Sequence, residues 1–182
     1  MAIETERIRL LLWRDDDWQA FRPIATDPEV MRYITNGVPW SDEQVREFIT
    51  RQMRWYDQRG FCLWKLVQSN SGRLIGFAGL QPLLVEGAPE IEIGWWLAKN
   101  CWGQGLATEA ATAALRDGFD RVGLKRIVAI ARPENVASIR VMQKLGLQYE
   151  REFIHKEIRH VLYATKVRPA SLTRGERESP PL

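Results

Sequence analysis

Apolar and polar positions along the 182-residue chain follow two periods, one typical of strands and the other of helices. Short apolar runs predict strands at 8–13, 61–67, 74–83, 90–97, 126–131 and 160–167. Apolar residues at helical spacing predict helices at 15–34, 41–59, 106–119 and 136–145. This alternation predicts one mixed α/β domain over residues 1–167.

Capping signals fix several helix ends. Ser41 and Gln44 have the spacing of a capping box, and Gly60 closes the helix that they open. Asp27-Pro28 interrupts the first helical segment, and Gly146 ends the last helix. We therefore expect four helical segments, the first of them broken.

Turn residues separate the central strands. The segment 69–72 (Ser-Asn-Ser-Gly) predicts a hairpin, and a Gly-Ala-Pro loop at 87–89 precedes the next strand. Within 90–97, Glu90, Glu92 and Gly94 would face one side of the sheet and the intervening apolar residues the other. One face of this strand should therefore be polar.

Composition narrows the class of protein. Apolar residues make up 45% and charged residues 27%, as in a globular domain. Residues 168–182 contain three prolines and few apolar side chains, which predicts a disordered tail. The net charge of +3 is spread among acids without a basic run, so we expect no nucleic-acid partner.

No signal-peptide pattern or apolar run of membrane length is found, which predicts a cytoplasmic protein with no membrane partner. Cys62 and Cys101 are the only cysteines and are expected to be reduced. The chain has only two histidines, and the cysteines and histidines together do not show the spacing of metal ligands. No metal is therefore expected.

Two glycines, Gly103 and Gly105, precede the alanine-rich helix at 106–119. Unpaired N–H groups at a helix start bind anions, and glycine lets the backbone approach a phosphate closely. The alternative is a tight strand-to-helix turn without a ligand. A P-loop lysine and the third glycine of a dinucleotide-binding fold are both missing.

The stretch EIGWWLAKNCWGQGLATEA (92–110), followed by NVASIRVMQKLGL (135–147), resembles the GCN5-related N-acetyltransferases (GNAT). The start of the chain is most similar to the branch that includes the ribosomal-protein N-terminal acetyltransferases, and the resemblance covers residues 4–167. It implies a single GNAT domain with helices on both faces of a twisted, mostly antiparallel sheet that splays after its fourth strand.

The resemblance implies that acetyl-CoA is the cosubstrate. Its pantetheine would pair with the backbone of Trp96, Leu97 and Ala98, and a backbone N–H there would polarise the acetyl carbonyl. Its diphosphate would bind the loop and first helical turn at Trp102, Gly103, Gln104, Gly105, Leu106, Ala107 and Thr108. Asn100 replaces the family's usual Gln or Arg at the start of this loop.

Three further residues are implied in cofactor binding: Asn135 at the pantetheine, Ser138 at the sulfur and Lys144 at the phosphates. Two of these residues, Asn135 and Lys144, also have a structural explanation. Asn135 can instead cap the helix that follows it, and Lys144 can instead interact with that helix's C-terminal dipole.

Acetyl transfer needs a base for the amine proton and a group that stabilises the leaving thiolate. The tyrosine acid of many relatives is replaced by Met142, so Ser138 is the candidate acid, with Tyr163 second. Glu92 is the candidate base, with Glu90 second. Either glutamate can instead be a structural or exposed strand residue, and a water relay can replace the base.

We therefore predict direct acetyl transfer from acetyl-CoA to a primary amine, either a protein N-terminus or a small molecule, with a homodimer as a possible assembly. Cys101 is not expected to act as a nucleophile, because direct attack needs none. The loop 35–40 is expected over the acceptor, beside Trp95 or Trp96, which face opposite sides of their strand. The alternatives are a catalytically weak acyl-CoA sensor and a protein that binds another phosphate ligand.

Overall fold

The structure is a computed structural model that describes residues 2–165. The described strands are β1 (Ala2–Glu4), β2 (Ile8–Leu11), β3 (Leu63–Gln68), β4 (Leu74–Val85), β5 (Ala88–Leu97), β6 (Ile127–Ala131), β7 (Gln148–His155) and β8 (Ile158–Thr165). The helices are η1 (Asp15–Asp17), α1 (Trp18–Ala25), α2 (Pro28–Met31), α3 (Asp42–Arg59), η2 (Lys99–Cys101), α4 (Leu106–Asp120) and α5 (Val136–Lys144). The tail predicted at 168–182 lies outside the described residues.

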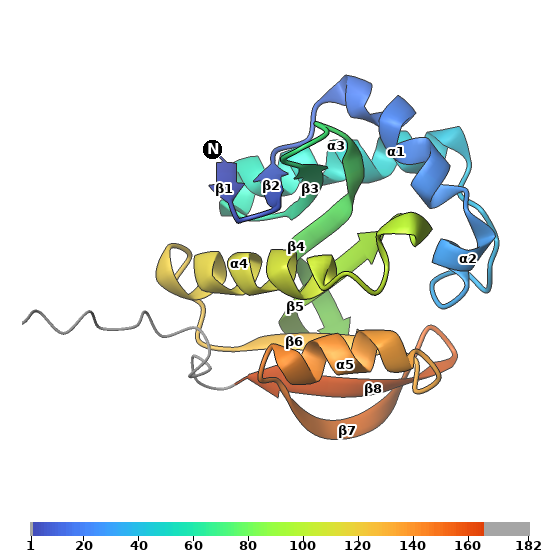
Figure 1. Ribbon diagram of the computed structural model, residues 1–182. Helices are drawn as coiled ribbons and strands as arrows, with labels where there is room; N and C mark the ends of the chain where they lie inside the picture. Colours follow the sequence, from blue (N-terminus) through green and yellow to red (C-terminus); the bar gives the residue numbers. More distant parts are fainter. Residues whose placement is uncertain (1, 166–182) are drawn as a thin grey trace, which may run out of the picture.

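All eight strands form one sheet in the order β1-β2-β3-β4-β5-β6-β8-β7. Neighbouring strands are antiparallel except β5 and β6, which run parallel and are in register at one described pair, Glu92 with Val128. Beyond that pair the two strands diverge, which separates the molecule into an upper half with β1–β5 and a lower half with β6–β8 (Figure 1). The predicted splay is confirmed, because β5 is the fourth of the strands expected from the sequence.

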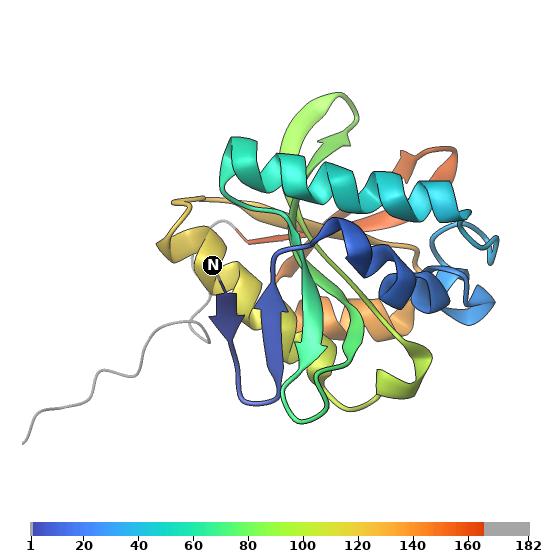
Figure 2. The ribbon, with the colours of Figure 1, turned by 90° about the horizontal axis from the view of Figure 1, so that it is seen from above.

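Helices cover both faces of the sheet, as Figure 2 shows from above. On one face α1 and α3 pack through Phe21 and Phe48 against Phe77 of β4. On the other face α4 packs through its alanines on β4 and β5. A Cβ added to Gly118 of α4 would lie 2.7 Å from Leu80 Cδ1, so the small side chains do let this helix lie close to the sheet.

The predicted capping signals are confirmed. Ser41 Oγ accepts from the Gln44 N–H at 3.2 Å, and the Gln44 side chain accepts from the Ser41 N–H at 2.8 Å. Gly60 ends α3 with φ +74°, and Gly146 follows α5 with φ +80°. The Asp27 side chain accepts from the Glu29 N–H at the break before α2.

Several element boundaries differ from the prediction. β5 begins at Ala88, so the expected loop at 87–89 shrinks to a turn at Glu86 and Gly87, both with positive φ. β1 and β7 were not predicted, because β1 is only three residues long and β7 is an edge strand with charged residues that interrupt the apolar alternation. The first helical segment, predicted to reach residue 34 with a break at Asp27-Pro28, forms η1, α1 and after the break only a single turn, α2.

Candidate active site

The loop that leads into α4 holds both predicted glycines in the left-handed region. Gly103 has φ +73° and Gly105 has φ +78°, a conformation that other residues adopt at a cost. A Cβ at Gly103 would meet nothing within 4 Å, so backbone conformation rather than crowding explains this glycine. The Gln104 side chain fixes the loop from within, because its Nε2 donates to the Asn100 carbonyl at 2.8 Å.

The first turn of α4 presents amide donors without helical partners. The first hydrogen bond of the helix runs from the Glu109 N–H to the Gly105 carbonyl at 3.0 Å, so the N–H groups of Leu106, Ala107 and Thr108 have no acceptor within the helix. Gly105 is the N-cap and has no side chain to cap them. This donor set, with the positive end of the helix dipole, fits a diphosphate.

Backbone groups of β5 are open toward the gap next to this loop. The Ala98 N–H donates to Ile75 of β4 at 2.8 Å, so it points away from the gap. Because successive residues of an antiparallel strand point their N–H groups to opposite sides, those of Leu97 and Trp95 face the gap. Of the predicted pantetheine segment, Trp96 to Ala98, only Leu97 turns its N–H toward the gap, and the N–H of Trp95 just before it does the same.

Trp102 connects the loop to the end of β5. Its indole Nε1 donates to the Leu97 carbonyl at 2.8 Å, while the ring remains 46% exposed. This carbonyl faces the gap as well. The predicted loop and strand segments are therefore joined at the edge of the splay.

Glu92 of β5 pairs with Val128 of β6, at the base of the gap. It is 8% exposed, and Gln81 Nε2 on β4 donates to its Oε2 at 2.7 Å. Burial raises the pKa of Glu92 to about 7, although the hydrogen bonds from Gln81 and from the Ile130 backbone oppose this rise. Glu92 therefore changes protonation near neutral pH, as a general base requires.

Glu90, the second candidate base, is held in an ion-pair cluster. Arg126 Nε contacts its carboxylate at 3.1 Å, and Arg126 Nη1 contacts Glu150 of β7 at 2.8 Å. Arg126 precedes β6, so the cluster ties β5, β6 and β7 together below the gap. This geometry favours the structural explanation for Glu90.

Asn135 and Ser138 lie at the start of α5. The Asn135 Oδ1 accepts from the Ser138 N–H at 3.2 Å, so the capping explanation is present in the structure. This leaves the Nδ2 group of Asn135 for a second bond. Lys144 is the exposed last residue of α5.

Exposure distinguishes Met142, which replaces the family's tyrosine, from the candidate acids Tyr163 and Ser138. Met142 is 1% exposed and packs in the core, so the position of the family's tyrosine points away from solvent. Tyr163 of β8 is partly buried, with its ring 5.7 Å from that of Tyr149. Ser138 of α5 is half-buried like Tyr163, so exposure does not separate these two candidates.

The two catalytic candidates lie on opposite faces of the sheet. Met142 of α5 packs with Ile93 of β5 in the core beneath α4 and α5. Glu92 precedes Ile93, so its side chain points to the other face, where α1 and α3 lie. Glu92 and Ser138 therefore flank the gap from its two sides.

The loop at 35–40 crosses from the upper half of the sheet toward the lower half. Trp40 packs against Trp96 of β5 with ring centroids 4.8 Å apart. Asn36 Oδ1 accepts from Arg132, between β6 and α5, at 2.6 Å. The loop thus lies on the same face as Glu92, because Trp96 and Glu92 share that face.

Comparison with known proteins agrees with this architecture. Residues 7–148 match the acetyltransferase (GNAT) domain family. The chain belongs to the GNAT acetyltransferase family. It is an acetyl-CoA-dependent N-acetyltransferase, which confirms the resemblance seen in the sequence.

Individual relatives share nearly the whole length of this GNAT domain. The uncharacterized N-acetyltransferase YnaD of Bacillus subtilis is 33% identical over 150 residues, which cover 82% of this chain and 84% of that protein. A GNAT-family acetyltransferase from Bacillus anthracis is 31% identical, with a TM-score of 0.77 over 91% of this chain and 98% of that one. RimL, a ribosomal L7/L12 alpha-N-protein acetyltransferase solved with coenzyme A, shares the fold at 17% identity and a TM-score of 0.76, over 92% and 98% of the two chains.

Within residues 2–165, no helix is both long and apolar enough to cross a membrane.

Proposed function

We propose that this enzyme transfers the acetyl group of acetyl-CoA directly to a primary amine while both substrates are bound. The observation that carries the proposal is the splay between β5 and β6, which opens beside the unpaired N–H groups of α4 and has Glu92 at its base. A thioester in this gap would be accessible from both faces of the sheet.

The proposed cofactor contacts follow the free donors. The N–H groups of residues 103–108 would hold the diphosphate, and the outward N–H groups of Trp95 and Leu97 would bind the pantetheine arm. Asn135 has a free amide for the same arm. Lys144 is proposed at the phosphates because its ammonium is exposed at the end of α5.

When bound, acetyl-CoA supplies an acetyl group activated as a thioester. We propose that Glu92 accepts the proton of the attacking amine as the new C–N bond forms. The C–S bond breaks with its electron pair on sulfur, where the Ser138 hydroxyl donates a hydrogen bond. An N–H of β5 would stabilise the negative charge that develops on the carbonyl oxygen.

Direct attack also agrees with the state of the cysteines. Cys101 is 3% exposed, and burial raises the pKa of Cys62 to about 12, so neither side chain offers an accessible thiolate. Intact mass measurement after incubation with acetyl-CoA should therefore show no acetylated Cys101. An accumulating acetyl-Cys101 adduct would replace direct transfer with an acyl-enzyme mechanism.

The acceptor is proposed to be either a peptide N-terminus or a small-molecule amine. A screen of both classes, with free thiol and acetylated product measured together, tests the proposal. We expect thiol release that depends on the amine and equals the product formed. Binding of CoA without turnover across the panel would instead support an acyl-CoA sensor, and tight ATP binding without CoA binding would overturn the cofactor assignment.

A further inference from the structure

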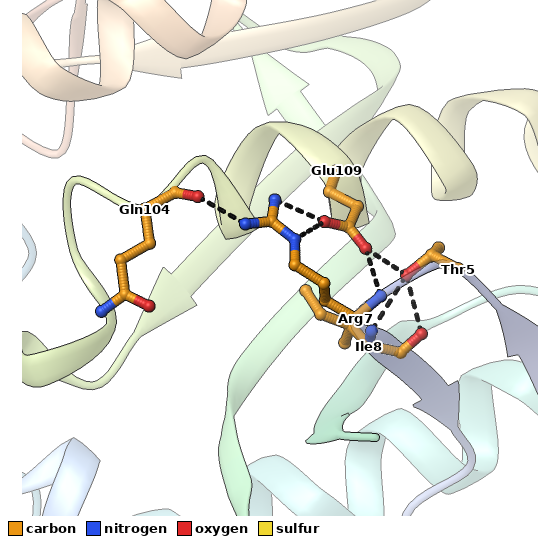
Figure 3. A network of polar contacts seen from close by, with 5 residues as sticks. All are labelled: Thr5, Arg7, Ile8, Gln104 and Glu109. Carbon is orange, nitrogen blue, oxygen red and sulfur yellow. Dashed lines mark hydrogen bonds and ion pairs between the residues drawn. The ribbon is translucent and has the colours of Figure 1, made fainter. Parts of the chain in front are cut away.

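Arg7 connects the N-terminal hairpin to the glycine loop, 97 residues further along the chain (Figure 3). It lies between β1 and β2, and its Nη1 donates to the Gln104 carbonyl at 2.9 Å. Its Nε and Nη2 contact Glu109 Oε2 at 2.7 and 2.6 Å. One planar guanidinium therefore holds both the loop and the first turn of α4.

The contact with Gln104 orients the next amide group. The described residues contain no cis peptide bond, so the Gln104 carbonyl and the Gly105 N–H point in opposite directions from their shared peptide plane. With the carbonyl held on the Arg7 side, the Gly105 N–H points to the side away from Arg7. The positive φ angles of Gly103 and Gly105 let the loop adopt this arrangement.

The contact with Glu109 balances a charge that would oppose an anion. Glu109 lies in the first turn of α4, where an unpaired carboxylate would repel a diphosphate. Thr5 Oγ1 and the Arg7 N–H also donate to its Oε1, at 2.7 and 2.9 Å. Burial alone raises the pKa of Glu109, but these hydrogen bonds and the Arg7 charge lower it below its ordinary value, so the carboxylate stays ionised and paired.

We propose that Arg7 is a positioning residue for diphosphate binding, acting through the Gln104–Gly105 peptide and through neutralisation of Glu109. This proposal rests on the proposed function, in which the loop binds CoA. Each of the three guanidinium nitrogens of Arg7 contacts Gln104 or Glu109, which links its effect on the ligand to the loop and the first turn of α4. The N-terminal hairpin is thereby part of the cofactor site.

Calorimetric titration of wild type, Arg7→Ala and Arg7→Lys with CoA, 3′-dephospho-CoA and pantetheine tests this role. Arg7→Ala should raise the Kd for both diphosphate ligands by about tenfold, the effect of losing a charge-assisted hydrogen bond. The Kd for pantetheine should change by less than about twofold. Arg7→Lys should be intermediate, because one ammonium cannot reproduce the fork that contacts both partners.

Two further variants separate the components of the effect. Arg7→Ala with Glu109→Gln removes both charges and should recover part of the CoA affinity, leaving the loss due to the freed peptide. Arg22→Ala breaks an exposed ion pair with Asp42 that does not touch the loop and should leave all three Kd values unchanged.

The pattern of losses decides among the explanations. Equal weakening of pantetheine and CoA would mean that Arg7 only supports the fold, and weakening of CoA but not of 3′-dephospho-CoA would mean direct contact with the 3′-phosphate. Either result overturns the positioning role, as does an unchanged Kd in Arg7→Ala. Failure of wild type to bind CoA would overturn the proposed function as well.

Discussion

Replacing Glu92 by glutamine should make the protein more stable at alkaline pH and less active. The wild-type carboxyl is buried, and its pKa is raised from 4.5 to about 7. A rise of this size corresponds to about 3 kcal/mol of free energy. Glutamine fills nearly the same volume but does not ionise, so it should not carry the cost of a buried negative charge.

The sign follows from proton linkage. The pKa of Glu92 is higher in the folded than in the unfolded state. Its stabilising contribution to the free energy of unfolding is therefore complete below pH 4.5 and is lost as the pH rises through 7. Between pH 5 and pH 8 the free energy of unfolding of Glu92→Gln should rise by about 2.5 kcal/mol relative to wild type. Glutamine has only one accepting oxygen for the two donors, Gln81 and Ile130, so a constant loss of about 1 kcal/mol should accompany this rise.

Urea unfolding of both proteins at pH 5, 6, 7 and 8 measures this difference. Subtracting the two curves cancels the titration of other groups, and only the slope with pH tests the burial argument. Glu47→Gln, on the exposed side of α3, is the matched control and should differ from wild type by less than about 0.5 kcal/mol at each pH. A Glu92→Gln difference that stays flat from pH 5 to 8 would refute the reasoning.

Activity gives the second half of the same prediction. If Glu92 is the base, the wild-type kcat/KM should rise with pH through about 7, because only the ionised carboxylate accepts a proton. Glu92→Gln should lower kcat/KM by about 100-fold at pH 8 and remove that ionisation from the profile. A variant that is stabilised but keeps full activity would assign the proton transfer to a water relay.

Substitutions at three other positions test separate parts of the structure. Asn135→Ala should lower the free energy of unfolding by about 1 kcal/mol, because it removes the α5 cap. Asn135→Asp should keep the cap and lose only CoA affinity. Equal unfolding curves for the two variants would contradict the capping role. Gly76→Ala would press a Cβ against the Trp96 carbonyl oxygen, so thermal unfolding should show a loss of at least about 2 kcal/mol, and an unchanged Tm would mean that β5 can shift freely. Arg126→Met should remove the ion pairs that Arg126 makes with Glu90 and Glu150 and so speed hydrogen exchange in β6, with no change in β2 as the internal control.

The elements that the sequence predicted well are those fixed by neighbours in the chain. Ser41 with Gln44 and Asp27 with Glu29 determine helix ends through hydrogen bonds within three residues. The glycine loop belongs to this group, since its left-handed residues precede the helix directly. The local pattern therefore predicted where a glycine turn leads into α4.

Turns whose positive φ angles fall on ordinary residues were missed for the opposite reason. Glu86, Lys156 and Glu157 all adopt positive φ, although only glycine, asparagine and aspartate favour it. Pairing of the strands on both sides holds these turns in place. The signal for β7 was weak as well, since its charged side chains are tolerated at the edge of the sheet.

Glu90 and Glu92 show why the chemistry of a site cannot be assigned from alternation alone. Both occupy the same face of β5, and the sequence pattern treats them alike. Arg126, 36 residues away, pairs with the first, whereas the second meets the neutral amide of Gln81 and the flanking strand β6. Burial raises the pKa of Glu92 more than its hydrogen bonds and the charge of Lys156 lower it, so two equivalent positions in the sequence become an ion-pair partner and a group with a pKa of about 7.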